Sequence, residues 1–290
     1  GPDRFRRSMN QSGGHQVTRE RTTEVPAGSG LSYSLKETIT TAGNEVASKW
    51  AHRPIDYRIE GQDVQHLQHG TSNAKSVTLS FWVRSNKTGI ASVLMTTYDS
   101  SSGTRNIAPR YTINAANTWE YKTITVAGDT GGNGIKNDQG LGFGLVFYGG
   151  AGAGYQVADQ SSTWGAAADN WWFGCTLDIN NVNDFIQFAG LQLEVGETTT
   201  PFEHRSYGDE LAKCQRYYER TGTVYTSDYG GSHSIYTHVY NVVKRAVPTV
   251  TLSGFESGTV TGTGTIHSNY VYRPNNQAAN SGEAIYEAEL

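Results

Sequence analysis

Three tryptophans lie close together in a Gly-rich stretch of the chain, and polar residues lie among them. Sugars present flat C–H faces that stack on indole rings, while their hydroxyl groups need carboxylate, amide or backbone partners. The stretch runs between predicted strands, where binding residues tend to lie. Residues 155–172 are therefore predicted to hold a glycan-binding site made of Trp164, Trp171, Trp172, Asp159 and Asn170.

A packing role is the alternative for some of these rings. Trp171 and Trp172 are neighbours in the sequence, and neighbouring side chains on a strand point to opposite faces. One of the pair is therefore expected in the core and the other on the surface. Trp82 and Trp119 fall in strong strand patterns, and we expect them to pack within the core or on a sheet face.

A second aromatic group lies in the last seventy or so residues, where tyrosines are frequent. Tyr combines a large apolar area with a hydroxyl group at small entropic cost, which suits protein interfaces and sugar contacts alike. We favour subunit packing over sugar binding for the tyrosines Tyr225, Tyr229, Tyr236 and Tyr240.

Catalysis and metal binding find no support in the residue pattern. Glycoside hydrolysis needs two carboxylates at a defined separation, whereas the acidic residues here are scattered over predicted turns. His66 and His69 lie three apart without another clear ligand, and no nucleophile elbow, phosphate loop or dinucleotide fingerprint is present. We expect no enzyme activity, no cofactor and no metal site.

Composition excludes further classes of function. The net charge of -4 argues against nucleic-acid binding, which needs a basic surface, and no apolar run is long enough to cross a membrane. The 34 Gly and 17 Tyr residues are typical of short strands joined by tight turns. Cys175 and Cys214 have no metal-site or disulfide spacing, so both are expected to be buried free thiols.

Alternating apolar and polar residues predict strands through most of the chain. The clearest run is 76–84, with Val77, Leu79, Phe81 and Val83 on one face. A polar turn ending in Gly89 separates this run from 90–98, so the two are predicted to form a hairpin. Gly residues alternate through 141–148, which indicates close approach of another backbone or a ligand. Eight to ten strands predict an all-β jelly-roll sandwich over residues 1–205.

One helix interrupts this pattern. Tyr207, Leu211, Cys214 and Tyr218 fall on one helical face, and Ser206 is a suitable N-cap. We predict a connecting helix over 206–222 that ends at a glycine, followed by a small β domain over 223–290.

The region around this helix resembles a signature found in phage tail-fibre and related virion proteins. The matching residues are LQLEVG at 191–196, TPFEHR at 200–205 and DELAKCQRYY at 209–218. Weaker matches lie at 3–5, 77–83, 118–120 and 244–250, the last with Lys244 where the family has Met. Physical reasoning assigns the 191–205 segment a structural role, with Gln192 and Glu194 hydrated and Phe202 anchored in the core.

The resemblance implies a carbohydrate-binding-type jelly roll followed by a variable C-terminal domain. It implies a non-enzymatic virion subunit, part of a tail fibre or similar appendage and a homotrimer, made in the bacterial host cytoplasm. Host-surface polysaccharide would be its ligand, and other virion proteins would attach through a missing N-terminal region. The rival interpretation is a purely structural virion protein (a capsid decoration, adaptor or assembly component) with protein contacts only, because one fold serves many functions.

Overall fold

The protein is described from a computed structural model. The described residues are 5–10, 15–42, 51–98, 103–156, 158–168, 171–221, 224–225, 227–229, 233–253, 261–265, 267–274 and 281–288. The chain divides into two compact units, Gly1–Glu203 and His204–Leu290, which we call the sandwich unit and the C-terminal unit.

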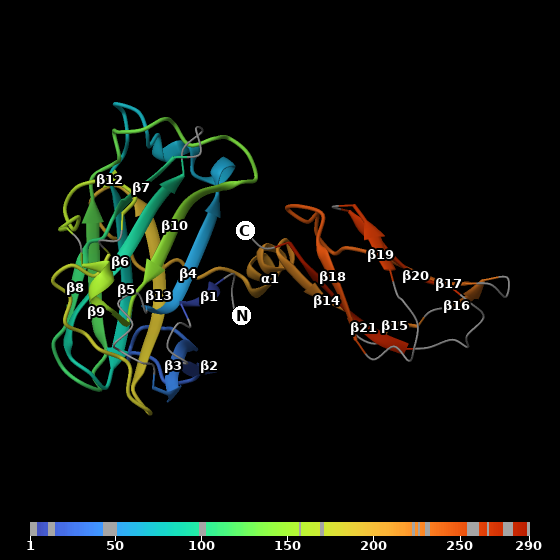
Figure 1. Ribbon diagram of the computed structural model, residues 1–290, viewed down its shortest axis with the longest axis horizontal. Helices are drawn as coiled ribbons and strands as arrows, with labels where there is room; N and C mark the ends of the chain where they lie inside the picture. Colours follow the sequence, from blue (N-terminus) through green and yellow to red (C-terminus); the bar gives the residue numbers. More distant parts are fainter. Residues whose placement is uncertain are drawn as a thin grey trace. The chain divides into compact units, whose positions relative to one another are not determined.

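The first sheet of the sandwich unit, sheet A, carries the face on which the candidate site lies. Its strand order is β1-β4-β10-β6-β7-β12, with β11 paired to β4 and β8 paired to β6. The bounds are β1 Phe5–Asn10, β4 Ala51–Glu60, β6 Gly89–Tyr98, β7 Thr104–Ile107, β8 Arg110–Ile113, β10 Leu141–Phe147, β11 Gly150–Ala151 and β12 Gly165–Ala166. In Figure 1, β4, β10 and β6 run side by side.

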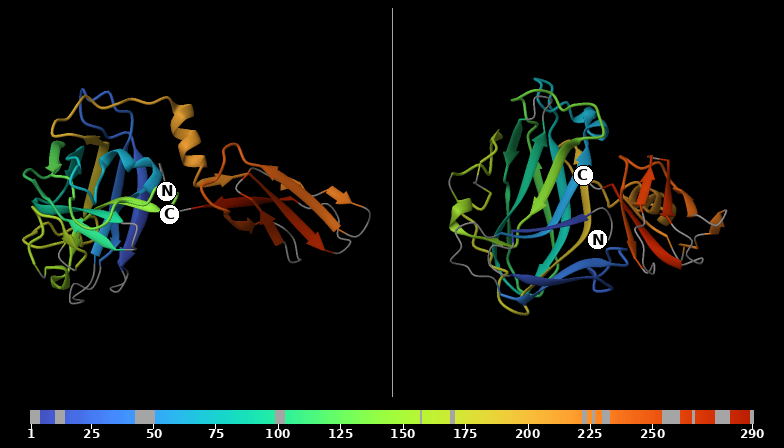
Figure 2. Two further views of the ribbon diagram at one scale, coloured as in Figure 1. Left: turned by 90° about the horizontal axis from the view of Figure 1, so that it is seen from above. Right: turned by 45° about the vertical axis from the view of Figure 1, so that its right-hand side comes forward.

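The second sheet, sheet B, has the order β2-β3-β13-β5-β9. Its bounds are β2 Gln16–Thr22, β3 Ser34–Thr41, β5 Val77–Ser85, β9 Glu120–Val126 and β13 Phe185–Val195. The two sheets form two layers (Figure 1 and Figure 2), and the chain crosses from one to the other between β3 and β4 and between β9 and β10. This alternation confirms the predicted all-β jelly-roll sandwich.

The predicted hairpin of 76–84 and 90–98 is wrong. The first run is β5, which lies between β13 and β9 in sheet B, and the second is β6, which lies in sheet A. The connection passes between the layers instead of closing a hairpin. Gly89 adopts φ +149, and a Cβ there would lie 2.8 Å from the backbone nitrogen of Leu177. The glycine therefore serves the crossing and a close backbone approach rather than a hairpin turn.

The core between the sheets is aromatic. Phe81 of β5 stands edge-on to Phe147 of β10, with ring centroids 5.0 Å apart, and Phe188 of β13 lies 5.1 Å from Phe147. Edge-to-face pairs of this kind are stabilising beyond the apolar area they bury. The apolar face predicted for β5 is confirmed, since Val77, Leu79, Phe81 and Val83 are at most 1% exposed, although Thr78 and Ser80 are buried as well.

The segment that resembles the virion signature ties β13 to the connection after it. Glu194 accepts hydrogen bonds from the backbone N–H (3.1 Å) and the hydroxyl (2.5 Å) of Thr200. The side-chain oxygen of Gln192 accepts a hydrogen bond from the backbone N–H of Glu203 at 2.8 Å. These contacts give the two polar residues a structural role, as the sequence indicated. Phe202 differs from its prediction: it is 37% exposed, so it is not anchored in the core.

The C-terminal unit begins with the helix α1, Tyr207–Gln215. Ser206 is the N-cap, and its hydroxyl accepts a hydrogen bond from the N–H of Asp209 at 3.1 Å. The helix is shorter than predicted, because the following residues form β14, Tyr218–Arg220, which pairs with β21, Ser281–Glu287. Pairing with a distant strand thus overrides the helical spacing of Tyr218. The helix falls within the C-terminal unit.

The rest of this unit is β, as predicted. One sheet contains β14, β21, β15 (Val224–Tyr225) and β18 (Thr249–Ser253). The other has the order β16-β17-β20-β19, with bounds Ser227–Tyr229, His233–Val239, Ser268–Pro274 and Thr261–Gly264.

The tyrosines predicted for subunit packing lie in this unit. Tyr240 is 6% exposed and packs edge-on against Tyr286, with centroids 5.1 Å apart, so it is a core residue and not part of an interface surface. The alternating sequence pattern around Tyr240 did not predict this burial, because the side chains that pack on Tyr240 come from strands distant in the sequence. The predictions for the side chains of Tyr225, Tyr229 and Tyr236 fall outside the described part of the chain.

Candidate functional site

The outward face of sheet A brings together residues from three central strands. In β10, Phe147 pairs with Ile55 and Val93, and all three are fully buried in the core. The side chains one residue earlier therefore point outward, because side chains alternate along a strand. Val146 pairs there with Asp56 of β4 and Leu94 of β6. We call this outward surface of β4, β10 and β6, with the loop segment that covers its end, the sheet A face.

An aromatic ring lies across one part of this face. Gly144 of β10 pairs with Arg58 of β4 and Thr96 of β6, and a Cβ built on Gly144 would be 3.6 Å from the ring of Tyr98. Tyr98 therefore lies over the glycine position. Burial raises the pKa of the Tyr98 hydroxyl, while the nearby Arg58 charge lowers it and Asp56 raises it further. The hydroxyl thus stays protonated and can donate or accept hydrogen bonds.

A charged pair lies beside this ring. The guanidinium of Arg58 donates two hydrogen bonds of 3.3 Å to the carboxylate oxygens of Asp56. The Arg58 side chain remains 30% exposed, whereas Asp56 is 5% exposed. A carboxylate that binds an arginine fixes the position of its guanidinium, and the exposed part of the side chain can contact a ligand. This pair is therefore suited to hydroxyl groups of a bound molecule.

A stack of rings covers the end of the sheet A face. Trp171 stacks on Tyr155, with centroids 4.1 Å apart and planes inclined by 22°, and it lies 5.5 Å from Tyr148 at 29°. The guanidinium carbon of Arg53 is 5.1 Å from the Trp171 centroid, within the range of a cation–π contact. The indole N–H donates to the carbonyl of Ala168 at 2.6 Å. Trp171 is thus held in place, and the residue as a whole is half-buried.

A hydrogen bond attaches this loop to the sheet. The hydroxyl of Ser92, which points outward from β6, donates to the carbonyl oxygen of Trp171. The backbone N–H of Trp172 donates to the carbonyl of Tyr155 at 3.0 Å. The tryptophan therefore rests on the central strands instead of projecting from a loop, and the indole, Arg58 and Tyr98 belong to one surface.

The structure separates the residues that the sequence grouped together. Trp172 is 3% exposed and belongs to the core, as expected for one member of the adjacent pair. Trp164 packs edge-on against His69 at 5.5 Å, and its N–H donates to the carbonyl of Ala127 at 2.8 Å, so it does not join Trp171. Asn170 lies outside the described residues.

Asp159 lies at the β8 side of sheet A, where Arg110 pairs with the outward-pointing Ser92. Its carboxylate is 3.3 Å from the guanidinium of Arg110 and accepts a hydrogen bond of 2.9 Å from the N–H of Ser161. Hydrogen bonds from Ser161 hold the pKa of Asp159 below its ordinary value. Asp159 therefore shapes the loop that leads to Trp171.

Sequence reasoning missed four members of the sheet A face: Arg53, Asp56, Arg58 and Tyr98. Arg53, Asp56 and Arg58 lie in β4 and Tyr98 lies at the end of β6, so local spacing does not show that these residues share a face with one another or with the Trp171 loop. One signal was present. The glycines of β10 predicted close approach, and the structure confirms it: a Cβ on Gly142 would lie 2.4 Å from the Cα of Gly61, and Gly144 receives the Tyr98 ring.

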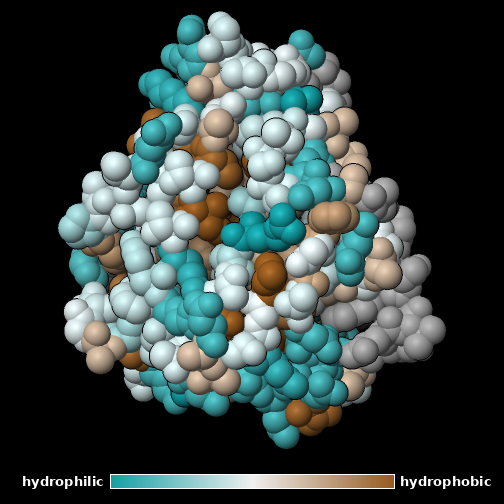
Figure 3. Space-filling model, turned by 90° about the vertical axis from the view of Figure 1, so that its left-hand side faces the viewer, coloured by the Kyte–Doolittle hydropathy of each residue, from teal (hydrophilic) through white to brown (hydrophobic). Residues whose placement is uncertain are grey.

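The remaining surface gives weaker indications of a binding site. On the side shown in Figure 3, hydrophobic residues form a broken band between hydrophilic ones. In the described ranges, no group of three or more His, Cys, Asp or Glu side chains is placed to hold a metal ion. The same ranges contain no helix with the length and apolarity needed to span a membrane. Cys175 and Cys214 are not joined by a disulfide; Cys175 is buried and Cys214 is half-buried.

No family model and no curated protein matches the sequence. Among solved structures, the enzymatically active domain of tailspike protein 4 from bacteriophage CBA120 aligns over 65% of this chain and 19% of its own, at 13% identity and a TM-score of 0.38. The family 11 carbohydrate-binding module of the Clostridium thermocellum cellulase Lic26A-Cel5E aligns over 69% of this chain and 92% of its own (11% identity, TM-score 0.35).

A third solved structure is the CBM22-2 xylan-binding domain of Paenibacillus barcinonensis Xyn10C, which aligns over 67% of this chain and 93% of its own (14% identity, TM-score 0.35). These are distant likenesses. The assignment of the sandwich fold rests on the strand order and core of the chain itself.

Proposed function

We propose that this chain is a non-catalytic glycan-binding protein and that the sheet A face is its binding surface. The observation that carries the proposal is the half-buried Trp171 ring, stacked on Tyr155 and positioned on the same sheet face as the Arg58–Asp56 pair. An indole face binds the apolar side of a sugar ring, and the guanidinium and phenol groups bind its hydroxyls.

The rigidity of this surface favours binding. Trp171 is held by ring stacking, by its own N–H and by the Ser92 hydrogen bond to its backbone. Arg58 is held by the carboxylate of Asp56. Groups that are already ordered lose little conformational freedom when a ligand binds, so more of the contact energy contributes to affinity.

The setting that we propose is a virion, in which the chain is a tail-fibre or similar appendage subunit that binds host-surface polysaccharide. The resemblance of residues 191–218 to phage tail-fibre proteins supports this assignment. A homotrimer, with further virion proteins attached to it, would present several copies of the sheet A face. Weak single sites would then give strong attachment, because linked sites bind with high effective concentration.

A binding assay with multivalent protein tests the proposal. The chain would be displayed on beads and applied to an array of bacterial capsule and lipopolysaccharide glycans. We expect binding to at least one glycan, with Trp171→Ala weakening the single-site affinity by about 2 kcal/mol, roughly thirtyfold. Arg58→Ala should weaken it by about 1 kcal/mol through lost hydrogen bonds.

A matched control separates the sheet A face from exposed rings in general. Tyr121 is 45% exposed and lies next to Trp82 on the outward face of sheet B. Tyr121→Ala should leave glycan binding unchanged. If no glycan binds even at high valency, the structural role in the particle replaces the adhesion role. If Tyr121→Ala weakens binding as much as Trp171→Ala, the sheet A face is the wrong surface.

A further inference from the structure

A single Asn-Gly pair, Asn133-Gly134, lies in the connection between β9 and β10 of the sandwich unit. Asparagine is among the thermolabile residues of proteins, because the backbone nitrogen of the next residue can attack its side-chain amide. The attack is intramolecular, so it requires only a suitable approach of the two groups. Glycine at the next position hinders this approach least, since it has no Cβ. The sequence thus marks Asn133 as the asparagine most open to this reaction.

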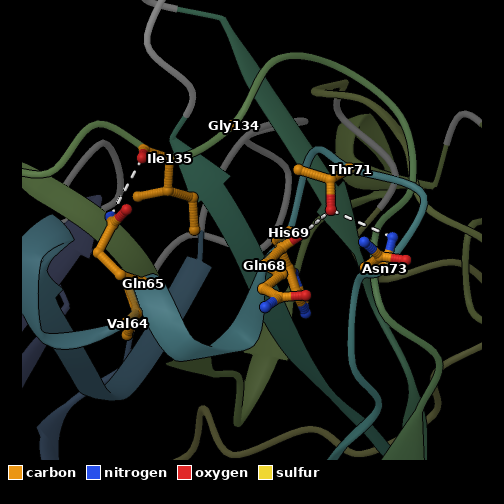
Figure 4. Close-up of a pocket in the computed structure, with 8 residues that line it drawn as sticks. All are labelled: Val64, Gln65, Gln68, His69, Thr71, Asn73, Gly134 and Ile135. Atoms are coloured by element: carbon orange, nitrogen blue, oxygen red, sulfur yellow. Dashed lines mark hydrogen bonds between the residues drawn. The ribbon is translucent and has the colours of Figure 1, made fainter.

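The structure leaves this pair accessible to water. Asn133 is exposed and Gly134 is half-buried. Gly134 also lines a cavity of about 330 Å³, whose other walls come from the short helix η2 (Gln65–Leu67), the turn after it and Ile135 (Figure 4). The exposed residue Gln68 lines the same cavity, which is therefore open to solvent. Water can thus reach the Asn133–Gly134 peptide group.

The attacking nitrogen is not held by a hydrogen bond. Within the described part of the chain, the N–H of Gly134 donates to no oxygen atom. Asn73, which is also exposed and lines the same cavity, provides the contrast. The N–H that follows it, of Ala74, donates to the carbonyl of Thr71 at 3.1 Å. A nitrogen held in this way is less free to approach a neighbouring amide, so hydrogen bonding favours reaction at Asn133 over Asn73.

A close backbone contact covers one face of the Asn133–Gly134 peptide group. A Cβ built on Gly70 would lie 2.2 Å from the carbonyl oxygen of Asn133, 2.5 Å from its carbonyl carbon and 2.7 Å from the nitrogen of Gly134. Because these distances are similar, Gly70 lies above the plane of the peptide group and not at its edge. The N–H of Gly70 donates to the carbonyl of Asp129 at 2.7 Å, which holds the contact in place.

We propose that Asn133 is a site of spontaneous deamidation and that the Gly70 contact directs its product to aspartate. The nitrogen of Gly134 loses its proton and bonds to Cγ of Asn133, the Cγ–Nδ2 bond breaks, and ammonia leaves. Water then opens the resulting succinimide ring. Addition of water at Cγ breaks the new Cγ–N bond and gives aspartate with the backbone path unchanged. Addition at the α-carbonyl carbon gives isoaspartate, which has an extra methylene in the backbone.

The Gly70 contact favours the first of these two ring openings. Attack on the α-carbonyl carbon needs that carbon to become tetrahedral and to carry a second oxygen, and Gly70 covers one of its faces. Isoaspartate would also place a carboxylate against the Gly70 backbone, whereas Cγ belongs to an exposed residue. The product is one more negative charge at the rim of the cavity. No residue of the sheet A face takes part, so the reaction does not depend on glycan binding.

Ageing of the full chain in mildly alkaline buffer, followed by peptide mapping with mass spectrometry, tests the site. The tryptic peptide 123–136 contains Asn133 as its sole asparagine, and the peptide 59–75 contains Asn73 as its sole asparagine. We expect the first peptide to gain a carboxylate while the second keeps its asparagine. Isoaspartyl methyltransferase, which methylates isoaspartate, then measures the isoaspartate fraction. This fraction should be lower in the folded chain than in a guanidinium-unfolded sample aged in the same buffer.

Substitutions then test the roles of the two residues. Gly134→Ala should slow deamidation severalfold, because the added Cβ hinders ring closure, and this Cβ would meet no other atom within 4 Å. Asn133→Gln should give no acidic form over the same time, since its longer side chain closes a ring less readily. Thr130→Ala changes an exposed residue of the same peptide and leaves the Asn-Gly pair intact, so it should have no effect. Melting curves check that each variant is folded.

Three outcomes overturn the proposal. One is an amide that persists at Asn133 in the folded chain over a time in which the unfolded chain loses it. Another is an equal rate at Asn133 and Asn73, or in Gly134→Ala and the parent chain, because the attack by the Gly134 nitrogen would then not set the rate. The third is an isoaspartate fraction in the folded chain that equals or exceeds that of the unfolded chain, since the Gly70 contact would then not direct the product.

Discussion

The buried ion pair of the C-terminal unit is the feature whose removal should have the largest effect on stability. Nζ of Lys244 lies 2.6 Å from the carboxylate of Glu219, and the two side chains are 0% and 4% exposed. The other Glu219 oxygen accepts hydrogen bonds from His238 at 2.8 Å and Asn241 at 3.0 Å. Lys244 also donates to the carbonyl of Gln215 at the end of α1. The pair therefore links the helix to β14.

We expect Glu219→Gln to destabilise the C-terminal unit by about 3–5 kcal/mol, because it leaves the Lys244 ammonium buried without a counter-charge. Lys244→Met should cost less, about 1.5–3 kcal/mol, since Glu219 keeps His238 and Asn241 as partners. In the double variant neither charge is left buried alone. Its loss should therefore be smaller than the sum of the two single losses, by a coupling energy of about 1–3 kcal/mol.

The distribution of tryptophans gives the assay an internal control. All six Trp residues lie in the first 172 residues, within the sandwich unit. Urea unfolding followed by Trp fluorescence therefore reports on that unit and should not change. Hydrogen exchange of the β21 amides, read by mass spectrometry, reports on the C-terminal unit and should show the loss.

Two results would refute this reasoning. The pair would not be a buried, mutually dependent charge pair if Glu219→Gln changed the exchange free energy of β21 by less than about 1 kcal/mol. The same conclusion would follow if the losses of the two single variants were simply additive. An equal shift of the Trp transition would show that the substitution acts on the whole chain instead.

Three more outcomes are expected. Gly142→Ala should destabilise the sandwich unit by about 1–3 kcal/mol in urea unfolding, because its Cβ would lie 2.4 Å from the Gly61 backbone, whereas Gly144→Ala, at 3.6 Å from the Tyr98 ring, should be tolerated. Although burial opposes them, hydrogen bonds from Lys122, Ala115 and Asn114 lower the pKa of Glu120 from 4.5 to about 2. The stabilisation that the Glu120 carboxylate provides is thus fully present above pH 4.5 and is lost as the pH falls towards 2. Glu120→Gln should therefore reduce the acid sensitivity of the Trp transition over that interval. Burial raises the pKa of Cys175 to about 11, so at pH 8 it should react with a thiol reagent far more slowly than Cys214 or the unfolded chain, and equal rates would contradict its burial.

Local patterns in the sequence predicted the strands well. The alternation of Val77, Leu79, Phe81 and Val83 is a property of neighbouring residues, and these four side chains do fill the core. The N-cap at Ser206 is also a local feature, since its hydroxyl bonds the N–H of Asp209 within one turn. Fold class and the start of the helix could therefore be predicted, because each depends on interactions over a few residues.

Long-range pairing decided the rest. β5 and β6 have the local pattern of a hairpin, yet they lie in different sheets, and Tyr218 leaves the predicted helix to pair with Glu287 in β21. The same holds for the sites. The sequence by itself determined an all-β sandwich with aromatic residues in its loops. Only the tertiary structure placed the Trp171 loop on the same sheet face as Arg58, because such neighbours are chosen by strand register and burial, which no local spacing encodes.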